Sequence, residues 1–123
     1  MFDKNFKGSS GIRGSLSASY LNNENAEKRK VQILEASTEI NNIILENKQK
    51  KIILKIDCEG AEYEILENLF ASKIINKIDV ILLEWHDNGA EPIEKLLLLS
   101  GFDTFSISLG LKSGMIYSKR KFN

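Results

Sequence analysis

Four side chains that can exchange protons or bind cations follow two apolar segments of the chain. Asp57 and Glu59 come after one run of mainly β-branched residues, and Glu84 and His86 come after the next such run. A positioned carboxylate can orient a hydroxyl group or take its proton, and histidine titrates near neutral pH. These residue types predict proton transfer on an acceptor group, or the binding of a positively charged ligand.

The elements around these residues predict that the four side chains meet. Residues 52–57 and 78–83 are nearly continuous apolar runs, which are typical of strands that a parallel sheet buries on both faces. Gly60 ends the first strand, and residues 61–72 have the periodicity of an amphipathic helix. A helical crossover of this kind can place the two strands side by side, with their carboxyl ends at one edge of the sheet. We expect Glu62, in the first turn of this helix, to be a surface residue that complements the helix dipole.

The remaining patterns complete an alternation of strands and helices. An α/β, Rossmann-like fold is therefore expected, with a mostly parallel sheet and a C-terminal antiparallel hairpin at or near the sheet edge. The other predicted elements are a strand at 31–34, a helix capped by Ser37 or Thr38, a helix from Pro92 to a cap at Gly101, and a hairpin of 105–109 with 115–117.

The composition is that of a single globular domain. The 123 residues fit one domain, and 17 Lys and Arg residues balance 17 Asp and Glu residues. This balance argues against nucleic acid or an anionic membrane as a partner. Cys58 is the single cysteine, which excludes an intramolecular disulfide and favours a reducing, cytoplasmic setting. No apolar stretch approaches the ~20 residues of a membrane span.

One segment is specific enough to indicate a family. Residues Lys55–Glu62 read K-I-D-C-E-G-A-E, between the predicted buried strand and the predicted helix. This stretch resembles the K-I-D-x-E-G-A-E signature of FkbM-type S-adenosylmethionine-dependent methyltransferases. The stretch Ile81–His86 resembles the next strand of that family, which ends in an acidic residue, and Ile93–Phe102 resembles its following helix. The resemblance covers roughly residues 31–120.

The resemblance implies methyl transfer from S-adenosylmethionine, most readily to a hydroxyl oxygen of a sugar, lipid or other small metabolite. It implies catalytic roles for Asp57, Glu84 and His86, with Asp57 and Glu59 beside the cofactor. It also implies that Glu59 and Glu62 contact the acceptor. Negative charge would favour the sulfonium cofactor, and catalysis would consist largely of aligning the reactants. No metal is expected.

The chain departs from the family's pattern in its first residues. Gly8, Gly11 and Gly14 follow no predicted strand and precede no predicted helix, so they do not form the glycine-rich cofactor turn of class I methyltransferases. We expect residues 1–30 to be a loop or a weakly ordered arm. Residues 31–123 would then be the C-terminal part of a methyltransferase domain that lacks the cofactor's glycine-rich motif.

Two other functions stay open at this point. The chain could be an inactive remnant or the partner subunit of a split methyltransferase. Its exposed sheet edge would then pair with the missing N-terminal half or with a second copy. Alternatively, the same four side chains could be ligands for Mg²⁺ or Mn²⁺ in a metal-dependent hydrolase or a metal-dependent methyltransferase. Because a D-x-E spacing is a weak signal, the hydrolase ranks below methyl transfer.

Overall fold

The computed structural model describes residues 2–3, 26–27, 30 and 32–122. Two short strands, β1 (Phe2–Asp3) and β2 (Ala26–Glu27), pair antiparallel. The three glycines of the N-terminal segment and most of the predicted arm lie outside the described residues, so the division at residue 30 stays a prediction. The main α/β unit is built from residues after 32.

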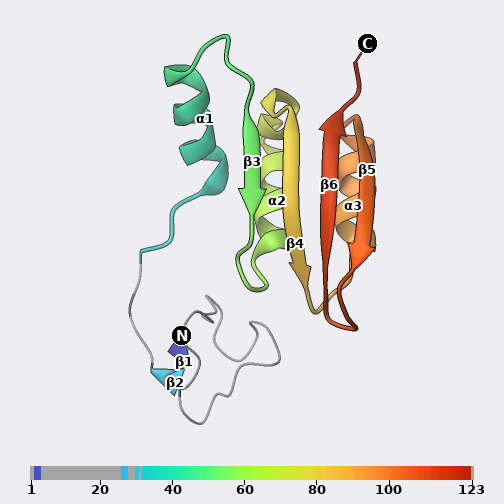
Figure 1. Cartoon of the computed structure of the whole chain (residues 1–123). Helices are drawn as coiled ribbons and strands as arrows, with labels where there is room; N and C mark the ends of the chain where they lie inside the picture. Colours follow the sequence, from blue (N-terminus) through green and yellow to red (C-terminus); the bar gives the residue numbers. More distant parts are fainter. Residues whose placement is uncertain (1, 4–25, 28–29, 31, 123) are drawn as a thin grey trace.

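Four strands form one mixed sheet in the order β3-β4-β6-β5 (Figure 1). Strands β3 and β4 are parallel, whereas β6 pairs antiparallel with both β4 and β5. The expectation of a mostly parallel sheet is therefore wrong. Three strands run in one direction, but the last strand of the hairpin enters between two of them and makes both of its pairings antiparallel. The strand bounds are β3 (Ile53–Ile56), β4 (Val80–His86), β5 (Phe102–Ser108) and β6 (Ser113–Arg120).

The helices cover one face of this sheet. In Figure 1, α2 and α3 lie behind the strands, and α1 lies beside β3, where it packs against α2. The face toward the viewer carries no helix of the described residues. None of the described helices is long and apolar enough to cross a membrane. The bounds are α1 (Ala36–Glu46), α2 (Glu62–Ala71), the 3₁₀ helix η3 (Ile74–Lys77) and α3 (Glu91–Leu99).

The hydrophobic core lies between the sheet and its helices. On β4, Ile81 and Leu83 alternate toward the helices and are fully buried, and Ile116 of β6 pairs with Leu83. The strand ending at residue 57 was expected to be buried on both faces, and this is wrong. Ile56 is 3% exposed but Ile53 is 65% exposed, because β3 is an edge strand of the described sheet and only one face is covered.

The prediction of a strand at residues 31–34 is also wrong for residues 32–34, which are the described part of that range. Residues 32–35 have no regular structure, and Ile33 and Leu34 are exposed. A short apolar run forms a strand only where a neighbouring strand offers hydrogen bonds, and no described strand lies beside this one. Helix α1 starts at Ala36 after Glu35, so the expected capping residues lie inside its first turn.

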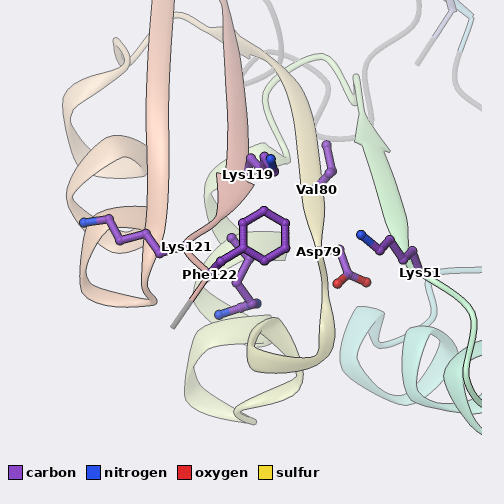
Figure 2. Close-up of a pocket in the computed structure, with 7 residues that line it drawn as sticks. Lys51, Asp79, Val80, Lys119, Lys121 and Phe122 are labelled. Carbon is purple, nitrogen blue, oxygen red and sulfur yellow. The ribbon is translucent and has the colours of Figure 1, made fainter.

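A hollow of about 110 Å³ lies at the opposite end of the sheet from the predicted site (Figure 2). Figure 2 shows the Phe122 ring at its centre, with Asp79 and Lys51 on the side of β3. Asp79 accepts a hydrogen bond from the backbone N–H of Ile52. Arg120 donates to the carbonyl oxygens of three residues, Ile75, Ile78 and Ser100. These bonds anchor the end of β6, so we interpret the hollow as structural.

Candidate functional site

The parallel pairing of β3 and β4 brings the predicted side chains together. Ile56 lies opposite Leu83, so the residues that follow both strands emerge at the same edge. Ligand-capable atoms of Asp57, Glu59 and His86 all lie within 4.8 Å of one another. Glu84 and His86 both lie on β4, and Glu84 Oε1 is 3.7 Å from His86 Nε2. We call the group Asp57, Glu59, Glu84 and His86 the acidic rim.

The turn between β3 and α2 aims backbone amides at a single carboxylate. Glu59 and Gly60 both have positive φ, 51° and 107°, a conformation that glycine adopts easily and glutamate seldom does. The backbone N–H of Cys58 donates to Glu62 Oε1 at 3.0 Å, and that of Gly60 donates to Glu62 Oε2 at 2.9 Å. The backbone of the signature K-I-D-x-E-G-A-E therefore turns around the side chain of its last residue, Glu62. This turn places Glu59 on the acidic rim.

Glu62 is a buried partner of His86, so the expectation of a surface position for it is wrong. Its side chain is fully buried, and its Oε1 lies 2.9 Å from His86 Nδ1. Burial acts to raise the pKa of Glu62, but the bonds to His86 and to the Gly60 and Cys58 amides outweigh it and lower that pKa. The Glu62 bond raises the pKa of His86, and burial opposes this. The pair therefore favours its charged form.

The second ring nitrogen of His86 faces the acidic rim. With Glu62 accepting the proton on Nδ1, Nε2 is the nitrogen that points at the site. Its neighbours are Glu59 Oε2 at 3.6 Å and Glu84 Oε1 at 3.7 Å, both beyond hydrogen-bonding distance. His86 is only 3% exposed. A buried nitrogen beside several carboxylates can exchange a proton with a ligand or bind a cation.

Asp57 is the most exposed member of the rim. It pairs with Lys55, whose Nζ lies 3.3 Å from Asp57 Oδ2, and both side chains reach solvent. An exposed pair of this kind contributes little to stability. It leaves the Asp57 carboxylate free to turn between Lys55 and a ligand. Next to it, burial raises the pKa of the Cys58 thiol, which favours its neutral form.

Tyr63 supports the site, although sequence patterns do not single it out. Its hydroxyl donates to the carbonyl oxygen of Gly89 at 2.8 Å and lies 3.2 Å from that of His86. Burial raises the pKa of Tyr63 to about 12, so the hydroxyl keeps its proton as a donor. This contact joins the start of α2 to the end of β4 and the loop after it. Only the fold reveals it, because the partners lie 23 and 26 residues away.

Comparison with known proteins places this geometry in a family. The family model described as "Methyltransferase FkbM domain" matches residues 3–104, which include the whole acidic rim and both strands that carry it. No curated protein and no solved structure matches the chain. The matched range covers well over half of the 123 residues. The chain therefore belongs to the FkbM methyltransferase domain family.

Proposed function

We propose that the chain forms the acceptor side of an S-adenosylmethionine-dependent O-methyltransferase that acts on a hydroxyl group of a sugar, lipid or other small metabolite. One observation carries the proposal beyond family membership. The acidic rim lies at the carboxyl edge of two adjacent parallel strands, where open α/β sheets bind ligands. Its carboxylates favour a positively charged donor, and the sulfonium of S-adenosylmethionine is such a donor.

The rim side chains have separate tasks in this reaction. Asp57 and Glu59 would hold the sulfonium end of the donor, and Glu59 would also orient the acceptor. S-adenosylmethionine would supply the methyl group, and a base of this chain would take the proton that the acceptor hydroxyl loses. Glu84 is one base that the geometry offers, and His86 Nε2 is a second when its imidazole is neutral. Glu62 acts through His86 rather than on the substrate, because it is fully buried.

On this proposal, a further segment forms the part of the pocket that binds the methionine end of the cofactor. Among residues 32–122, the structure has no strand that leads through a glycine-rich turn into a helix. We therefore assign that part of the pocket to chain beyond these residues or to a partner chain. The acidic rim would complete the pocket from the acceptor side.

A second candidate function is that of a non-catalytic partner subunit, and the open face of the sheet favours it. Phe105 and Ile107 of β5 lie in register with Tyr117 and Met115 of β6, away from the helices. Phe105 is 63% and Ile107 is 44% exposed. Exposed apolar side chains in adjacent rows are typical of a surface that another layer covers. Light scattering after size exclusion would separate a monomer from an assembly.

Calorimetry with S-adenosylmethionine in EDTA-containing buffer tests the main proposal. We expect binding that weakens about tenfold in Asp57→Asn and Glu59→Gln, because each loses one unit of negative charge beside the sulfonium. Asp103→Asn is the matched control, since Asp103 is an exposed carboxylate on β5 that pairs with Lys121. Equal affinity of all these variants would refute the rim as the cofactor site. Absence of binding in every variant would favour the partner subunit.

A further inference from the structure

We propose that the acidic rim is a binding site for one divalent cation of the Mn²⁺ and Mg²⁺ class. The ligands are His86 Nε2 and carboxylate oxygens of Glu59 and Asp57, whose atoms lie within 4.8 Å of one another. Ligand atoms around such a cation lie about 3–4.3 Å apart, given bonds of about 2.1 Å. Asp57 and Glu59 both reach solvent, so small side-chain rotations would close the remaining gap.

His86 supplies an independent reason to place a cation here. A histidine that serves only the core would bury both nitrogens against hydrogen-bonding partners. In His86, Nδ1 is fixed by the buried Glu62 at 2.9 Å, whereas no residue of the described segments is hydrogen-bonded to Nε2. A carboxylate that holds one nitrogen while the other points at a site is the usual support of a metal-binding histidine.

The charge of the rim points in the same direction. Glu59 and Glu84 each come within 4 Å of His86 Nε2, and Asp57 lies in the same cluster. These three carboxylates carry more negative charge than one imidazole can balance, and a divalent cation that displaces the Nε2 proton would relieve the repulsion between them. One imidazole with carboxylate oxygens suits Mn²⁺ better than Ca²⁺, which takes oxygen ligands alone. Glu84 could complete the site directly or through water.

Cation binding stands on this geometry and does not depend on methyl transfer. Only its use rests on the proposed function: beside an acceptor hydroxyl, the cation would stabilise the developing alkoxide. From the sequence alone, a metal site at these residues ranks low because D-x-E spacing is common. The structure adds the buried support of His86 by Glu62, which no spacing rule contains.

Titration of the EDTA-treated chain with MnCl₂ at pH 7.5 tests the site by calorimetry and by NMR. The chain has one histidine, so its imidazole signals need no assignment among several. We expect a stoichiometry near one and paramagnetic broadening of these signals at substoichiometric Mn²⁺. Mg²⁺ should compete and restore them.

Variants of the ligands and of their support locate the cation. Glu59→Gln should weaken Mn²⁺ binding at least tenfold, and Glu62→Gln should weaken it about tenfold by loosening His86. The control Asp103→Asn should bind like the original chain. Absence of heat and of broadening at millimolar Mn²⁺ would overturn the proposal, as would undiminished binding by Glu59→Gln. S-adenosylmethionine affinity is measured in EDTA, so the two proposals fail or succeed separately.

Discussion

Replacing Glu62 by leucine should destabilise the fold far more than a change at an exposed glutamate. Glu62 Oε1 and Oε2 accept bonds from His86 Nδ1 and from the backbone N–H groups of Cys58 and Gly60, at 2.9, 3.0 and 2.9 Å. Leucine leaves these three donors without an acceptor. Breaking a buried ion pair costs about 3–5 kcal/mol, and unmet buried donors cost about 1–3 kcal/mol each when water does not reach them. We expect a loss of about 4 kcal/mol.

Urea unfolding followed by the fluorescence of Trp85 measures this loss. Trp85 is the single tryptophan and is 7% exposed, so it reports on the core beside the site. With a slope of about 2 kcal/mol per molar urea, the midpoint should fall by about 2 M. Glu62→Gln keeps one acceptor oxygen but turns an amide N–H toward one of the donors, so about 1–2 kcal/mol should be lost. This variant remains measurable if the leucine variant does not fold.

Glu67→Gln is the matched control, because Glu67 is exposed on the same helix. Its unfolding free energy should stay within about 0.5 kcal/mol of the original. A loss below about 1 kcal/mol in Glu62→Leu would refute the argument. It would mean that the carboxylate does not hold His86 and the turn amides in solution.

Three further outcomes follow from the same contacts. Because the pKa of Glu62 is lowered and that of His86 is raised, the pair should stabilise the metal-free fold most between about pH 4.5 and 6.5. Urea midpoints should fall below this window as Glu62 gains a proton, and above it as His86 loses one; a flat profile would contradict the shifts. Tyr63→Phe should cost about 1–2 kcal/mol by removing its hydroxyl bonds. Gly114→Ala should lower the melting temperature by several degrees, because the added Cβ would lie 2.5 Å from the backbone oxygen of Ile107. An unchanged unfolding midpoint in Tyr63→Phe or in Gly114→Ala would contradict the contact on which that prediction rests.

Local sequence patterns were sufficient for the order of most elements. The apolar run before Asp57, the helix after Gly60 and the hairpin all form where they were predicted. These features depend on side-chain periodicity and on turn residues, which act over a few positions. The meeting of Asp57 and His86 was also predictable. A helical crossover favours parallel neighbours, and the carboxyl ends of parallel neighbours share an edge.

The sheet order and the burial of single polar residues were not predictable in this way. The position of β6 between β4 and β5 depends on pairing across the chain, and a hairpin pattern fits an edge or an inner position equally well. Glu62 looks like a first-turn surface residue from its own helix. Its burial is decided by His86, 24 residues away, and by a turn whose amides need an acceptor.

The sequence by itself determined which residue types follow the two apolar strands, and therefore that carboxylates and the single histidine gather at one edge of an α/β sheet. Periodicity and the signature carry this information because both are local. Only the tertiary structure decided that Glu62 holds His86 Nδ1, that Nε2 faces the carboxylates, and that the described helices all leave one face of the sheet uncovered. Those outcomes depend on distances between side chains of different elements, which residue spacing along a chain does not specify.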